Sequence, residues 1–208
     1  MRMFILAMLL GAAAQAASPA NGIDEPPRRG TFVETSLGVF TAMGGNVPFS
    51  NAQPYLGLTF GRELGEAATV FASLGIGAAS ASCYQVDARS GNCLAADAFG
   101  ATFVEGGASY GFPVGLRSSI SLKMVLGFTD LSPGPVRSGS PATVPDHLPG
   151  FHMGAGASLD YDTHLEHFAV GIDALIRYTL ARYTPAGGDS QTLGLPSLAV
   201  MPRIRYVF

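Results

Sequence analysis

Charged side chains are the residues of this sequence with the clearest chemical potential, because they recur at alternate positions inside otherwise apolar or glycine-rich segments. Eight charged residues follow this pattern, of which four are carboxylates and four are cations. Charges removed from water persist in a fold only when they are paired and hydrogen-bonded. The pattern therefore predicts an interior network of ion pairs, either a structural plug or an ion or proton path. The predicted members are Glu34, Glu105, Lys123, Asp160, Asp173, Arg177, Arg203 and Arg205.

Two pairings within this network follow from simple strand geometry. If the hairpin that joins their segments is symmetric about residue 114, Glu105 lies directly opposite Lys123. If the first and last segments pair with residue 31 level with residue 208, Glu34 lies opposite Arg205. No excess of one sign lines the interior as a selectivity ring would, which favours the structural role over the path.

Two cysteines, Cys83 and Cys93, lie ten residues apart in one long connection. In an exported chain, oxidising surroundings favour a disulfide between them. Closing so short a loop stabilises a fold by roughly 2–3 kcal/mol in the chain-entropy model. A metal site needs more ligands than two thiols provide, so we expect neither a metal nor a cofactor.

Four histidines raise the question of catalysis. His147 and His152 could approach Asp146 or a loop serine and form a hydrolase-like site near the outer leaflet of a membrane. However, no serine, histidine and acid fall on neighbouring segments at one height. His164 and His167 are expected at a turn. We therefore predict no catalytic residues and no enzyme.

Composition limits the elements that can position these groups. Of the 208 residues, 48% are hydrophobic and only 13% are charged, against about 25% charged in soluble domains. The 27 glycines exclude a helix bundle, because each glycine inside a helix costs about 1 kcal/mol. A net charge of −3 without a basic run argues against nucleic acid as a partner.

The chain begins with the features of an export signal: Arg2, an apolar stretch, and Ala14-Gln15-Ala16 as a small-x-small cleavage site. We predict a signal peptide over residues 1–16 and a flexible periplasmic leader over residues 17–30. The apolar stretch is too short for a spanning helix, which needs about 20 residues. The remainder, 31–208, then forms the structured part.

Period-two alternation recurs in eight segments of this remainder, with large apolar residues on one face and glycine, serine, threonine and the charges on the other. Each segment has a length typical of a tilted strand that crosses a bilayer. Eight is the smallest usual number of strands in a membrane barrel. The segments are 31–41, 53–61, 68–78, 99–110, 119–129, 151–161, 167–178 and a last one that ends at residue 208.

The connections between the segments alternate in length, as in outer-membrane barrels with short periplasmic turns and longer extracellular loops. The glycine-rich face carries too few charges for a water-exposed surface but suits the lining of a narrow lumen. The sequence therefore predicts an all-β, eight-stranded antiparallel transmembrane β-barrel in the bacterial outer membrane, with its apolar face toward lipid. The long connections are 42–52, 79–98, 130–150 and 180–192, and the short ones are 62–66, 111–117 and 162–166.

The C-terminus carries alternating apolar residues that end in phenylalanine. Ile204, Tyr206 and Phe208 resemble the signal by which the barrel assembly machinery recognises bacterial outer-membrane proteins. Pro196 and Pro202 disagree with this strand, because proline removes a hydrogen-bond donor where a closed barrel has no free edge. We expect a bulge or a locally open seam at Pro202.

Several stretches are similar to the outer-membrane family of adventurous gliding motility proteins of the CglE type. The similar residues are Asn51-Ala52-Gln53-Pro54-Tyr55-Leu56-Gly57, Ser82-Cys83-Tyr84-Gln85 with Cys93, Thr102-Phe103-Val104-Glu105 with Gly107-Ala108, Asp162-Thr163-His164 with His167-Phe168 and Val170-Gly171, and Pro202-Arg203-Ile204-Arg205-Tyr206. The resemblance implies a non-enzymatic structural or interaction component linked to surface gliding, with other envelope motility or adhesion proteins as partners. The alternatives are a small barrel enzyme that acts on lipid or peptide at the outer leaflet, and a narrow pore.

Overall fold

The computed structural model describes residues 30–45, 48–65, 67–80, 83–85, 92, 98–165, 167–185 and 188–208. The predicted signal peptide, 1–16, and the predicted leader, 17–30 apart from Gly30, lie outside the described residues and stay predictions. Within the part of the chain that is described, no helix is both long and apolar enough to span a membrane.

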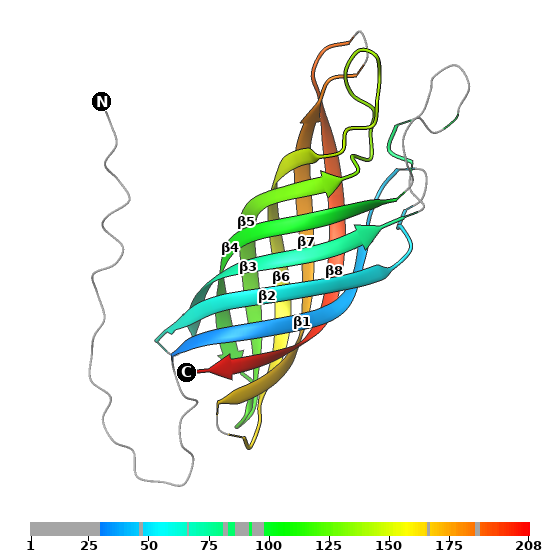
Figure 1. The fold of residues 1–208 in the computed structure, drawn as a ribbon. Helices are drawn as coiled ribbons and strands as arrows, with labels where there is room; N and C mark the ends of the chain where they lie inside the picture. Colours follow the sequence, from blue (N-terminus) through cyan, green and yellow to red (C-terminus); the bar gives the residue numbers. More distant parts are fainter. Residues whose placement is uncertain are drawn as a thin grey trace, which may run out of the picture.

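Eight antiparallel strands form a closed barrel in which each strand pairs with its neighbours in the chain and β8 returns to β1 (Figure 1). The predicted all-β, eight-stranded antiparallel fold is confirmed. The strands are β1 (Thr31–Ala42), β2 (Gln53–Leu64), β3 (Ala68–Ala79), β4 (Phe99–Pro113), β5 (Ser118–Ser132), β6 (Leu148–Asp162), β7 (Phe168–Tyr183) and β8 (Gln191–Val207).

Side-chain alternation explains why these segments form strands with two unlike faces. On β5, Leu122, Met124 and Leu126 are 58%, 71% and 62% exposed, whereas Lys123 and Val125 between them are buried. Successive side chains of a strand point to opposite faces, so the apolar set lies outside and the polar set inside. The barrel is thus apolar on its outer surface, the reverse of a protein that meets water there.

Connection lengths divide the barrel into two ends. The turns β2–β3, β4–β5 and β6–β7 lie at one end with the C-terminus, and we call this the turn end (Figure 1). The long connections lie at the other, the loop end. The fourth loop is 184–190 rather than 180–192, because alternation continues to Tyr183 on β7 and resumes at Gln191 on β8.

The loop-end half of the lumen holds an apolar core. Phe40, Phe103 and Leu131 are at most 1% exposed there. Val136, from the connection between β5 and β6, is also fully buried in this cluster, and Gly134 anchors the same segment by donating from its amide to the carbonyl of Pro145 at 2.8 Å. The first residues of the β5–β6 loop therefore pack against the apolar core at the loop end of the barrel.

Glycines on the inner face make room for aromatic rings inside the lumen. A Cβ added at Gly75 would meet the Tyr55 hydroxyl, and one added at Gly77 would meet the Phe40 ring 2.8 Å away. The Phe40 and Tyr55 rings stack with centroids 6.2 Å apart. A barrel of eight strands has room for few large side chains, so small residues on β3 offset large ones on β1 and β2.

The closing seam between β1 and β8 is interrupted at Pro202, but no bulge forms there. The pairs Ser36 with Arg203 and Val39 with Val200 keep one register, while the two pairs between them are missing. Because the register is the same on both sides, no residue is inserted. Of the two expected outcomes, the structure has the locally open ladder.

Candidate functional site in the barrel interior

The eight predicted interior charges all lie on the inner face of the barrel. Seven are at most 9% exposed, and the eighth, Arg205, has a side chain that is 15% exposed. They divide into two clusters at different heights, one toward the turn end and one toward the loop end. We define the turn-end cluster as Glu34, Glu63, Lys123, Asp160, Asp173, Arg203 and Arg205, and the loop-end cluster as Tyr55, Ser73, Glu105, Thr129, His152 and Arg177.

Arg203 is the hub of the turn-end cluster. Its guanidinium binds Glu34 on β1 and Asp160 on β6, and its Nε lies 2.8 Å from Asp173 Oδ1 on β7. A planar guanidinium offers five donors in a fixed fork, which suits contacts to several carboxylates. Arg205 Nε donates to Glu34 Oε2 at 3.1 Å. Arg203 alone consequently ties β8 to three other strands.

Lys123 completes the turn-end cluster and corrects one predicted pairing. Its Nζ donates to Asp173 Oδ2 at 2.5 Å and lies 3.9 Å from Glu34 Oε1. The prediction that Glu105 lies opposite Lys123 is wrong: Glu105 is level with Gly127. Because β4 continues to Pro113, the turn falls later in the chain than the sequence suggested, which shifts the register by four residues.

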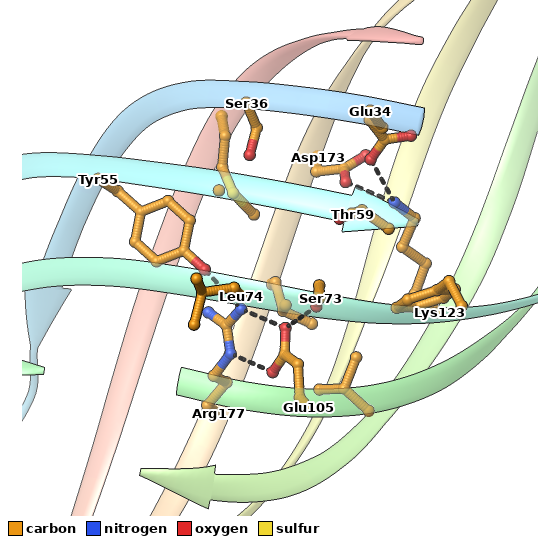
Figure 2. A pocket seen from close by; sticks show the side chains of 15 residues that line it. Glu34, Ser36, Tyr55, Thr59, Ser73, Leu74, Glu105, Lys123, Asp173 and Arg177 are labelled. Carbon is orange, nitrogen blue, oxygen red and sulfur yellow. Dashed lines mark hydrogen bonds and ion pairs between the residues drawn. The ribbon is translucent and has the colours of Figure 1, made fainter. Parts of the chain in front are cut away.

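A bidentate ion pair is the centre of the loop-end cluster (Figure 2). Arg177 donates from Nε and Nη2 to the two oxygens of Glu105 at 2.9 and 2.7 Å, and from Nη2 to the Tyr55 hydroxyl at 2.9 Å. Ser73 also donates to Glu105, at 3.0 Å. Parallel hydrogen bonds between charged partners are among the strongest that side chains make. The charge of the fully buried Arg177 is thereby balanced inside the barrel.

His152 is also fully buried in the loop-end cluster. Its Nε2 lies 2.9 Å from Glu105 Oε2 and its Nδ1 lies 2.7 Å from Thr129 Oγ1. A carboxylate only accepts hydrogen bonds, so Nε2 is a donor to Glu105. The hypothesis that His152 forms a hydrolase-like site with His147 near the outer leaflet is therefore wrong, because its ring points into the lumen.

Three titratable members of the clusters escaped the predicted network: Tyr55, Glu63 and His152. Glu63 Oε1 lies 3.6 Å from Arg205 Nη1 and extends the turn-end cluster to β2. Side-chain alternation could have identified these three residues, because each of them occupies an inward position on its strand. The predicted β2 segment ended at residue 61, one inward position short of Glu63.

The aromatic rings of the lumen also face the cations. The Arg177 guanidinium lies 4.6 Å from the Phe103 ring centroid, and that of Arg205 lies 4.4 Å from the Phe32 ring. Cations over aromatic faces gain about 0.5–2 kcal/mol, with the larger values where water is excluded. Rings therefore supplement the carboxylates in holding the buried guanidinium groups.

A cavity of about 30 Å³ separates the two clusters. Lys123 and Asp173 line it on one side, and Glu105 and Arg177 line it on the other (Figure 2). This volume suits one or two water molecules and is an order of magnitude below a typical site for an organic ligand. Within the described residues, no group of three or more histidines, cysteines or acids could hold a metal ion.

The remaining predicted residues lie at the two ends of the barrel. His147 Nδ1 is 2.6 Å from Asp130 Oδ2 in an exposed pair at the loop end, so Asp130 rather than Asp146 is its acidic partner. Cys83 is buried, whereas Cys93 lies outside the described residues, so the disulfide stays a prediction.

The residues of the predicted assembly signal lie at the turn end of β8 and just beyond it. Ile204 and Phe208 are 55% and 68% exposed on the outer surface. The Tyr206 ring contacts the rings of Phe168 and Phe208 with centroids 5.1 and 5.0 Å away. Recognition of these residues by an assembly machinery stays a prediction.

An apolar outer surface, a lumen filled by ion pairs and a closed ring of eight strands define the fold class: the chain folds as a small eight-stranded β-barrel of the kind found in the bacterial outer membrane. Neisserial surface protein A is similar in structure, with a TM-score of 0.55 and 9% identity over 86% of this chain and 97% of that one. A major outer membrane protein of Thermus thermophilus is similar too, with a TM-score of 0.51 and 11% identity over 86% and 99%. No protein-family model and no curated protein sequence matches the chain.

Proposed function

We propose that the chain is a non-enzymatic, non-conducting outer-membrane protein that presents its long loops as a fixed surface for a partner. One observation carries this proposal: apolar side chains pack the loop-end half of the lumen, and the β5–β6 loop adds Val136 to them. Val136 of that loop is fully buried against an apolar core with Leu131, Leu148 and Leu195. A lumen packed with apolar side chains at one end is a barrier to ions and solutes, which disfavours the alternative of a narrow pore.

Hydrogen bonds between different loops support the idea of a fixed surface. Gly139 donates from its amide to the carbonyl of Thr184 at 2.8 Å, which joins the β5–β6 and β7–β8 loops. The Arg137 amide donates to Gln85 Oε1 at 2.7 Å, which joins the β3–β4 loop to the same cluster. Loops held in one arrangement lose little conformational entropy when a partner binds. This ordered cluster is the surface that we propose for partner binding.

The link to gliding motility rests on the CglE-type resemblance alone. Its test is deletion of the gene followed by tracking of single cells on agar. We expect reduced gliding that is restored by the wild-type chain but not by a variant in which residues 137–143 are replaced by glycine and serine. Normal gliding in the deletion strain would overturn the motility role and leave the barrel assignment intact.

Planar-bilayer recording tests the non-conducting lumen. We expect no steady conductance from the purified protein, and steady channels that persist after repurification would contradict the proposal. The enzyme alternative has its own assay at the exposed pair of His147 and Asp130, where a His→Ala change would abolish any cleavage of lipid or peptide that depends on this pair. We expect no such cleavage from wild type or from His147→Ala.

A further inference from the structure

The two prolines of β8 remove hydrogen-bond donors from one edge of that strand only. Successive residues of a strand direct their backbone groups to opposite neighbours. Phe208 donates from its amide to the carbonyl of Thr31 on β1, and Val207 donates to His167 on the β7 side, both at 2.8 Å. Even-numbered residues of β8 therefore face β1. Pro196 and Pro202 are both even-numbered, so both missing donors belong to the closing seam.

The hydrogen-bond ladders reflect this asymmetry. In the seam, the pairs Leu37 with Pro202 and Gly38 with Met201 are missing, because both pairs require the same absent N–H group. The pairing of β8 with β7 continues past Pro202 without a break. Among the eight ladders of the described strands, the one between β1 and β8 is the only interrupted one.

Buried ion pairs cross the seam next to this interruption. Glu34 belongs to β1, and it binds Arg203 and Arg205 of β8, which are one and three residues from Pro202. Glu34 and Arg203 are each 3% exposed. Arg203 continues to Asp160 and Asp173, so the last strand is tied to β6 and β7 as well as to β1.

We propose that Glu34, Arg203 and Arg205 form an ionic clamp that holds the proline-weakened β1–β8 seam closed, and that this seam is where the barrel opens when the clamp is released. Separation of β1 from β8 would leave the Glu34 carboxylate and the guanidinium groups unpaired at the edge of a lipid-facing gap. Charge exposed to hydrocarbon is strongly unfavourable. The clamp therefore stabilises the closed seam by more than the missing backbone hydrogen bond weakens it. The interior charges thereby gain a specific role beyond filling space.

Amide hydrogen exchange of the full barrel in detergent micelles tests the clamp. In Glu34→Gln, we expect the seam amides that face the partner strand, Thr35, Val39, Val200 and Ile204, to exchange at least tenfold faster than in wild type. Amides in the β4–β5 ladder should change less than twofold. Pro202→Val, which restores the missing N–H, should slow exchange in the seam and remove most of the effect of Glu34→Gln when the two are combined.

Matched variants distinguish the clamp from general loss of stability. Glu105→Gln breaks the loop-end cluster, which does not bridge β1 to β8. This variant should not selectively accelerate amide exchange in the seam. Pro149→Val is the control for proline replacement, because the missing N–H of Pro149 points toward β7 beyond the end of that ladder at Gly150. If Glu34→Gln does not fold, Arg205→Gln serves in its place. Equal acceleration in all ladders, or no rescue by Pro202→Val, would overturn the proposal.

Discussion

Removal of the Arg177 side chain should strongly destabilise the barrel. It is fully buried, and its guanidinium is the only strong cation that binds Glu105 in the described part of the chain. Removing one partner of a buried ion pair leaves an uncompensated charge and costs about 3–5 kcal/mol. We expect Arg177→Met to lower the free energy of unfolding by about this amount. Urea titration of the protein folded in phospholipid vesicles measures it.

The same strand provides the control for this change. Arg182 lies five residues further along β7 and is exposed at the loop end. Arg182→Met should change the free energy of unfolding by less than about 0.5 kcal/mol, as for most surface substitutions. The double variant Arg177→Met with Glu105→Gln removes both charges and should recover part of the loss. Equal effects of Arg177→Met and Arg182→Met would contradict a stabilising ion pair.

Gly75 tests how the lumen accommodates its rings. A methyl group at this position would collide with the Tyr55 hydroxyl, which also accepts a hydrogen bond from Arg177. We expect Gly75→Ala to destabilise the fold by about 1–3 kcal/mol, as overpacking usually does. Gly106→Ala is the matched control, since its methyl group would meet only the Phe71 carbonyl oxygen at 3.9 Å. The same urea titration measures both variants. An unchanged free energy of unfolding in Gly75→Ala would contradict tight packing around Tyr55.

At the scale of elements, the β3–β4 loop is predicted to be closed by a disulfide. Cys83 is 7% exposed, and its sulfur approaches the carbonyl oxygen of Gln85 at 3.5 Å. We expect an alkylating reagent to label neither cysteine in the unfolded, unreduced chain and to label both after reduction, which mass spectrometry detects. Replacing both cysteines with serine should lower stability by about 2–3 kcal/mol. Labelling before reduction would contradict the bridge.

Strand positions could be predicted from the sequence because alternation is a local property. The outward-facing apolar residues of β5 and β7 could be identified without knowledge of the partner strands. Every predicted segment overlaps an observed strand. Register was harder, because it depends on where each turn falls. The β4–β5 turn lies later than expected, so Lys123 binds Asp173 on β7 instead of Glu105 on β4.

The contacts of the loop-end cluster could not be predicted, because they join residues far apart in the chain across the lumen. Arg177 and Tyr55 are 122 residues apart and belong to strands that do not pair. Only the closure and tilt of the whole barrel bring them to the same height. The interruption of the β1–β8 seam was easier to predict, since Pro202 alone indicated where the ladder would be interrupted.

At the scale of the whole molecule, the decisive property is which face meets lipid. Leu126 lies roughly halfway along β5 and is 62% exposed, whereas Leu116 is 95% exposed in the turn between β4 and β5. If water surrounded the barrel, arginine would be tolerated at both positions. In a bilayer, arginine on the lipid face of a barrel costs about 2–4 kcal/mol near the midplane and about 0–1 kcal/mol near the interfaces.

We therefore expect Leu126→Arg to lower the free energy of unfolding in phospholipid vesicles by about 2–4 kcal/mol and Leu116→Arg to change it by less than about 1 kcal/mol. The comparison separates lipid contact from packing, because neither side chain is buried in the protein and neither faces the lumen. The two variants should change the free energy of unfolding equally only if no hydrocarbon contacts Leu126. Equal, small effects would mean that the apolar surface does not contact the bilayer core, and the assignment of the inner charges to a membrane-spanning lumen would fail with it.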